Sequence, residues 1–303
     1  MVWTAASALA GMLCAQPHSL FAHGDTHEQI EKLTRQIVAS PQDAALHVKR
    51  GELHRLHRDW NAAQADFDRA AQLDPELPLL DLLGGRLLLE MDQAADAKLH
   101  LDRFLATRPQ HVEALVTRAR VFTKLRDVVS AAKDFSAAIA LSPEPKPEYF
   151  LERAQALRTD NAHFAEALRG LNEGVQQFGP LVTLETLAIE LELETGNYDG
   201  ALARVERLAA QSPRQESWLA RRGEILLQAG RATEARAAFA QALTTVDTLS
   251  VSQRKTEAIL QLEIRLRARL QVLTNSALHA RIPSAADSRL VKSGETPAPS
   301  VDE

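Results

Sequence analysis

Four prolines recur at a fixed distance along the chain. Pro41, Pro75, Pro109 and Pro143 are separated by intervals of 34 residues. Proline cannot continue a helix, so each of these positions ends a helical segment. A constant period of about 20 to 50 residues is typical of repeat architectures, in which each unit packs only against its neighbours. The sequence therefore predicts a stack of similar units rather than a fold built around one central core.

The unit after the first of these prolines has the pattern of two helices joined by a short turn. Ala63, Phe67 and Ala70 are spaced so that they share one face of a helix. Small residues at Gly51 and Ala63 let two antiparallel helices approach closely, and Phe67 fills the gap that remains. We therefore expect a helical hairpin whose alanines are contact points.

This arrangement of small, aromatic and proline residues resembles the tetratricopeptide repeat, a family with a helical hairpin of about 34 residues. The matching positions in the clearest units are Gly51, Trp60, Ala63, Phe67, Ala70 and Pro75; Gly85, Ala97, Leu101 and Pro109; Ala119, Ala131, Phe135, Ala138 and Pro143; and Gly223, Gly230, Ala235, Phe239 and Ala242. Two less regular units carry Ala154, Ala167, Leu171 and Gly174, and Ala188, Gly196, Tyr198, Ala201 and Pro213. The resemblance covers residues 43–247 and implies about six units that form an all-α, right-handed α-solenoid.

The segments on both sides of the repeats are predicted to be capping helices, over residues 23–42 and 248–274. An open stack needs such caps, with a polar outer face, to end its apolar core. The apolar positions that share one face are Ile30, Leu33 and Ile37 upstream, and Ile259, Leu262, Leu266, Leu270 and Leu273 downstream. The apolar pattern fades after this second helix, and residues 275–303 are predicted to be a disordered tail.

The N-terminal residues 1–22 have the character of a secretory signal. The stretch MVWTAASALAGMLCA has no charged side chain and is too short for a transmembrane helix. We expect cleavage after Ala22, with Ala15 as the alternative, and therefore a periplasmic or secreted protein. Leu13 stands before the single cysteine, Cys14, where a lipid-attachment signal favours a small residue.

Composition excludes several classes of function. The chain has 35 Lys and Arg against 40 Asp and Glu, a net charge of −5, whereas a general nucleic-acid binder needs a strongly basic face. One cysteine cannot form a disulfide framework. The sequence also has no nucleophile motif and no glycine-rich phosphate loop. We therefore expect a protein that is not an enzyme and needs no cofactor.

The resemblance implies that the first helix of each hairpin lines a concave groove for a protein or peptide partner. The residues predicted to face this groove are Lys49, Glu52, Arg55, Leu82, Arg86, Glu90, Val116, Arg120, Lys124 and Arg158. Its four arginines could recognise acidic groups of a partner, because guanidinium binds carboxylate through two parallel hydrogen bonds. Alternatively, they are solvated surface charges compensated by nearby glutamates. On the first interpretation, the protein is a scaffold of the cell envelope that holds a partner segment.

A metal site is the alternative from another class of function. The segment HGDTHE places His23, Asp25 and His27 at alternate positions, and cleavage after Ala22 would make His23 the new amino terminus. His54 and His57 lie close enough along one helix to share a metal ion. On this interpretation the chain is a metal-binding accessory protein or a weak metalloenzyme.

Overall fold

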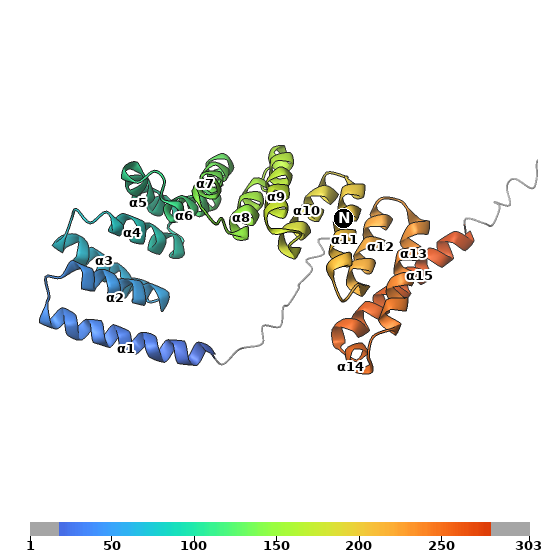
Figure 1. The fold of residues 1–303 in the computed structure, drawn as a ribbon, viewed down its shortest axis with the longest axis horizontal. Helices are drawn as coiled ribbons and strands as arrows, with labels where there is room; N and C mark the ends of the chain where they lie inside the picture. Colours follow the sequence, from blue (N-terminus) through green and yellow to red (C-terminus); the bar gives the residue numbers. More distant parts are fainter. Residues whose placement is uncertain (1–17, 280–303) are drawn as a thin grey trace, which may run out of the picture. The chain divides into compact units, whose positions relative to one another are not determined.

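The structure is a computed structural model that describes the backbone of residues 18–279 and the side chains of residues 26–275. Within this part the chain forms fifteen α-helices and one short 3-10 helix, with no β-strand (Figure 1). The prediction of an all-α solenoid is confirmed. No helix in this part has the length and apolar character needed to cross a membrane. Most of the predicted signal and most of the predicted tail lie outside the described residues.

The chain divides into two compact units, the first of which ends at Asp160. Its helices are α1 (His18–Ala39), α2 (Ala44–Leu56), α3 (Trp60–Leu73), α4 (Leu79–Glu90), α5 (Ala94–Thr107), α6 (Val112–Lys124), α7 (Val128–Leu141) and α8 (Pro147–Leu157). Hairpins form from α2 with α3, α4 with α5, and α6 with α7, while α1 packs on α2 and α8 packs on α7. The first helices of successive hairpins, α2, α4 and α6, also contact one another.

The second unit begins at Asn161. It contains η1 (Asn161–His163), α9 (Phe164–Phe178), α10 (Val182–Glu194), α11 (Tyr198–Gln211), α12 (Glu216–Gln228), α13 (Ala232–Asp247), α14 (Val251–Arg254) and α15 (Glu257–His279). Here α10 pairs with α11 and α12 pairs with α13, while α9 packs on α10 and α15 packs on α13. The segment expected to form one downstream capping helix is therefore two helices, of which α14 is a single turn.

Each regular hairpin is closed by a small residue on its first helix that meets a bulky one on its second. A Cβ atom placed on Gly51 would lie 2.6 Å from Cε1 of Phe67, and one placed on Gly85 would lie 2.7 Å from Cγ of Leu101. The first member of each pair must therefore stay small. The second helices also carry the alanines that the sequence predicted to be contact points. All of them are 0% exposed: Ala63, Ala97, Ala131, Ala167, Ala201 and Ala235.

The turn inside each hairpin of the first unit passes through a residue in the left-handed region. Arg58, Asp92 and Arg126 have φ values of 64°, 62° and 60°, and they lie 34 residues apart. The backbone amide of the following residue donates a hydrogen bond to a carbonyl of the preceding helix. In the third hairpin this bond runs from Asp127 N to Phe122 O and is 2.9 Å long. This hydrogen-bonding pattern satisfies the last carbonyls of the first helix and fixes the direction of the second.

A buried acid–base pair joins the two helices of the first and third hairpins. The carboxylate of Asp66 on α3 accepts from Nε of Arg50 at 2.8 Å and lies 3.1 Å from Nδ1 of His47, both on α2. Asp134 on α7 accepts from Nε of Arg118 on α6 at 2.7 Å. Since Asp66 and Asp134 are 4% exposed, each carboxylate is neutralised where water cannot solvate it.

The second hairpin has the same pair with its charges exchanged between helices. Asp81 on α4 lies 34 residues after His47, and His100 on α5 lies 34 residues after Asp66. Nδ1 of His100 is 3.0 Å from the Asp81 carboxylate, which also accepts from Arg103 at 2.7 Å. At this contact an acidic side chain is paired with a basic or imidazole side chain, and either helix can carry the acid.

The strained turns give a test of backbone energetics. We expect Arg126→Gly to raise the free energy of unfolding by about 0.5–1 kcal/mol, because glycine adopts a positive φ without a steric penalty. Gly230→Ala, at a φ of 75° with no other group within 4 Å, should lower it by about 1 kcal/mol. Thermal denaturation followed by circular dichroism measures both changes. Equal effects of the same sign would contradict this account.

Candidate functional site

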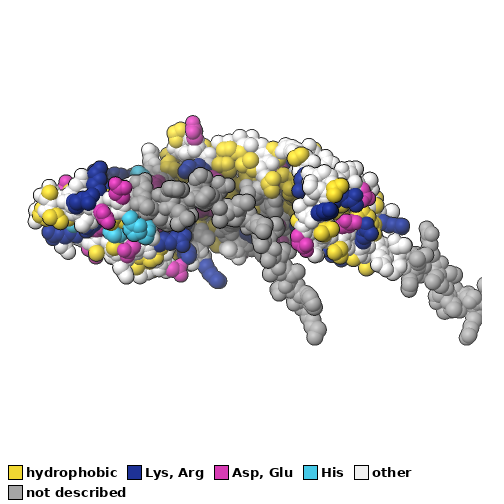
Figure 2. Space-filling view, turned by 90° about the horizontal axis from the view of Figure 1, so that it is seen from below, with side chains coloured by type: hydrophobic (Ala, Val, Ile, Leu, Met, Phe, Trp, Pro, Cys, Tyr) yellow, Lys and Arg dark blue, Asp and Glu magenta, His cyan; other side chains and the backbone are white. Residues whose placement is uncertain are grey.

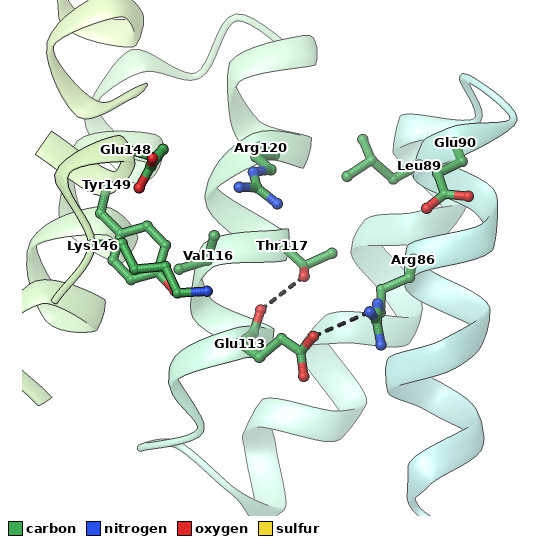
Figure 3. A pocket seen from close by; sticks show the side chains of 10 residues that line it. All are labelled: Arg86, Leu89, Glu90, Glu113, Val116, Thr117, Arg120, Lys146, Glu148 and Tyr149. Carbon is green, nitrogen blue, oxygen red and sulfur yellow. Dashed lines mark hydrogen bonds and ion pairs between the residues drawn. The ribbon is translucent and has the colours of Figure 1, made fainter. Parts of the chain in front are cut away.

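A hollow of the first unit lies over the first helices of consecutive hairpins. Its volume is about 610 Å³, and α4, α6 and the start of α8 supply its lining (Figure 3). Leu89, Val116 and Tyr149 give it an apolar part, and Thr117 lies on α6 between them. Figure 3 shows these side chains converging from three helices on one open space.

A second hollow of about 390 Å³ adjoins the first. Both are lined by Leu89 and Arg120, so they form one continuous depression, here called the α4–α6–α8 groove. Phe135 of α7 lies at the base of the second hollow and is 1% exposed. The other residues that line it are Thr123, Lys124, Glu152 and Gln155.

The first two arginines of the predicted series already bind carboxylates of their own chain. Arg55 is 8% exposed and donates to Glu52 at 2.9 Å and to Glu90 at 2.5 Å. Arg86 forms an ion pair with Glu113 at 3.1 Å and lies 3.8 Å from Glu52. These contacts join α2 to α4 and α4 to α6, so they stabilise the stacking of neighbouring repeats.

The third arginine and the neighbouring lysine are paired in the same way. Arg120 donates two hydrogen bonds to the carboxylate of Glu152 on α8, at 2.7 and 2.8 Å. This interaction raises the pKa of Arg120 above its usual value. Lys124 forms a 2.6 Å ion pair with Asp92. Recognition of an acidic partner by Arg120 would therefore require that its bond to Glu152 be broken.

The charges of the first hollow are balanced. Those that line it are Arg86, Arg120 and Lys146 against Glu90, Glu113 and Glu148. On the face drawn in Figure 2, Lys and Arg side chains are likewise interspersed with Asp and Glu. The geometry thus favours the interpretation that the arginines are compensated charges, and it gives the groove no field of one sign.

The remaining predicted groove residues take several positions. Val116 and Leu82 are 3% and 2% exposed and both pack in the core of the unit, but only Val116 also lines the first hollow. Lys49 is exposed on α2, and Arg158 is half-buried at the end of α8; neither lines the first or the second hollow.

Sequence reasoning missed Thr117, Phe135, Lys146 and Tyr149. The assumption that only first helices face the groove excluded Phe135, which reaches it from a second helix. Lys146 precedes Pro147 at the start of α8, where the 34-residue register changes. Proline at the first helical position fixes where a helix begins, and this signal could have placed both Lys146 and Tyr149 at its entrance.

His27, His54 and His57 contact other side chains of the chain. His54 lies 3.6 Å from the Asp59 carboxylate, and the rings of His27 and His57 meet edge to face with centroids 4.5 Å apart. Among the side chains of residues 26–275, no three potential ligands lie close enough to hold a metal ion. The side chains of His23 and Asp25 lie outside the described residues.

A buried charge cluster of the second unit joins three helices. Arg204 of α11 donates to Glu185 at 2.7 Å and to Glu192 at 2.9 Å, both on α10, and to Asn172 of α9 at 2.7 Å. Glu185 is 0% exposed and also accepts from Arg207 at 3.0 Å. Burial raises the pKa of Glu192, against the opposing effect of Arg204. The carboxylates and guanidinium groups of this cluster bind one another, so the cluster fixes the packing of α9, α10 and α11.

Comparison with known proteins finds similarity at the level of repeats and fold. A family model described as tetratricopeptide repeat matches residues 82–144 and 186–248. Among solved structures, the C-terminal part of a repeat protein from Cytophaga hutchinsonii is 13% identical, with a TM-score of 0.61, and covers 81% of this chain and 97% of its own. A repeat protein from Parabacteroides merdae is 19% identical, with a TM-score of 0.52 and coverages of 82% and 95%. YrrB, described as having an unusual peptide-binding site, is 18% identical, with a TM-score of 0.51 and coverages of 63% and 97%. No curated protein matches the chain.

Proposed function

Because the chain is a tetratricopeptide repeat protein, we propose that it is a non-catalytic scaffold that holds a protein or peptide segment in the α4–α6–α8 groove. The observation that carries this proposal is the continuity of two hollows across three helices. A continuous depression can receive several successive side chains of one segment, whereas an isolated pocket receives one. The peptide-binding site named for YrrB supports the same class of partner.

The apolar residues of the groove supply the main contact. Leu89 lies where the two hollows meet, and Tyr149 continues the apolar surface on α8. Val116 also lines the first hollow, although it is only 3% exposed. Tyrosine offers a large contact area and a hydroxyl group while losing little side-chain freedom on binding. We therefore infer that a partner places an aliphatic or aromatic side chain beside Tyr149.

An acidic group of the partner would bind Lys146. This lysine is exposed and lines the first hollow beside Tyr149. Unlike Arg86 and Arg120, it has no ion pair with the described part of the chain. A carboxylate could thus approach it without breaking an internal bond. We therefore still propose a partner with acidic groups. In this proposal Lys146, and not the series of arginines, binds the partner's carboxylate.

Peptide binding tests the groove. Short peptides selected from a random library against the full chain should combine an apolar residue with a carboxylate. We expect Lys146→Glu to weaken the best peptide by about tenfold, since it replaces attraction by repulsion at an exposed contact. Tyr149→Ala should weaken it by a similar factor. Fluorescence anisotropy measures both.

Lys133→Glu is the matched control, because Lys133 is exposed on α7 and lines neither hollow. Lys146 is a cleaner choice than Arg120, whose reversal would leave Glu152 without its partner. The side chain of Lys146 also makes no capping hydrogen bond at the start of α8, so this helix should persist in Lys146→Glu. Unchanged peptide affinity in both groove variants would reject the groove as the binding site.

We also propose that the scaffold works in the cell envelope. The support is the uncharged, apolar N-terminal stretch described above, which has the character of an export signal. Fractionation of producing cells, followed by N-terminal sequencing of the mature protein, tests this. Export with His23 as the first residue is expected. A cytosolic protein that still begins at Met1 would contradict it.

A further inference from the structure

The last long helix has two different faces. On its inner face, Ile259, Leu262 and Leu266 are 2%, 6% and 2% exposed, and they belong to the apolar core that α15 shares with α13. The core of the second unit is therefore closed on this side. The opposite face of α15 carries apolar side chains that lie outside this core.

That outer face carries a row of apolar side chains. Leu260, Ile264 and Val272 are 43%, 60% and 62% exposed, and Ala268 between them is exposed as well. The four residues follow one another at intervals of four, so they lie along one side of the helix over about 18 Å. A terminal helix of an open stack is expected to have a polar outer face. The row departs from that expectation and is called here the α15 outer row.

The α15 outer row is complementary to itself when reversed. About a centre at Leu266, Leu260 is the counterpart of Val272, and Ile264 is the counterpart of Ala268. In two antiparallel copies of the helix, the large side chain of Ile264 would therefore meet the small side chain of Ala268. Polar residues beside the row follow the same symmetry, with Gln261 and Gln271 as counterparts.

Two of the arginines next to the row are already neutralised. Arg267 forms an ion pair with Glu263 at 2.5 Å, and Arg269 pairs with Glu224 of α12 at 3.0 Å. A second copy could therefore approach this face with less repulsion than the sequence RLRAR suggests.

We propose that the chain forms a two-fold symmetric dimer through the α15 outer row. A two-fold contact uses the same surface on both copies, which the reversed complementarity of the row satisfies. Side chains spaced four residues apart form ridges that interdigitate when two helices cross at about −50°. A single pair of helices buries an area at the low end of specific interfaces, so we expect a dissociation constant on the order of 10 µM.

Sedimentation velocity of the full chain tests the dimer. Over a concentration series, the wild-type protein should change from monomer to dimer. Ile264→Glu should raise the dimer dissociation constant by about tenfold or more, because it places a charge in the centre of the contact. Val129→Glu is the matched control, since Val129 is 63% exposed on α7, and it should leave dimerisation unchanged. Far-ultraviolet circular dichroism verifies that both variants remain helical.

A disulfide trap tests the antiparallel register. With Cys14 replaced by serine, the double substitution Ile264→Cys and Ala268→Cys should give a covalent dimer on mild oxidation, because each new thiol faces its counterpart on the other copy. Val129→Cys in the same background should remain monomeric on a non-reducing gel. The proposal is overturned by a wild-type chain that stays monomeric throughout the series, by dimerisation that Ile264→Glu does not weaken, or by failure of the trap.

Discussion

The close contact between a small residue on one helix and a bulky residue on the next controls the rest of the structure. Glycine at Gly51 and Gly85 lets each hairpin close until the facing side chain of Phe67 or Leu101 fills the remaining space. Such a hairpin has too little core to be stable alone, so its other faces pack on the hairpins before and after it. The stacking of first helices, and hence the groove, follows from this one contact.

The same close approach explains the distribution of charge. Once two helices are held at a short distance, a polar residue between them is buried and needs a partner. The pairs of Asp66 with Arg50 and of Asp81 with His100 meet this need with opposite polarity. On the groove side, Arg120 and Glu152 neutralise each other between neighbouring repeats. Internal pairing therefore accounts for most charged groups of the groove, which is why the proposed recognition of a partner is assigned to its apolar residues and Lys146.

The sequence was sufficient for those features that repeat. The period of 34 residues, the burial of Ala63 and its equivalents, and the role of Phe67 all depend on contacts inside one hairpin, where spacing determines geometry. The candidate site was harder to predict because it depends on contacts between hairpins. Glu152 stands 32 residues after Arg120, and no local pattern shows that these two side chains meet. The α15 outer row was also missed. The apolar residues on the inner face of α15 were enough to predict a capping helix, so the other face was not considered.

A double-mutant cycle on Gly51 and Phe67 tests the central claim most directly. Gly51→Ala and Phe67→Leu are made singly and together, and the free energy of unfolding is measured by chemical denaturation. If the two residues are held in contact, the shorter leucine should relieve much of the crowding that Gly51→Ala creates, which gives a coupling energy of about 1–2 kcal/mol. Additive effects, with no coupling, would contradict the contact on which the hairpin depends.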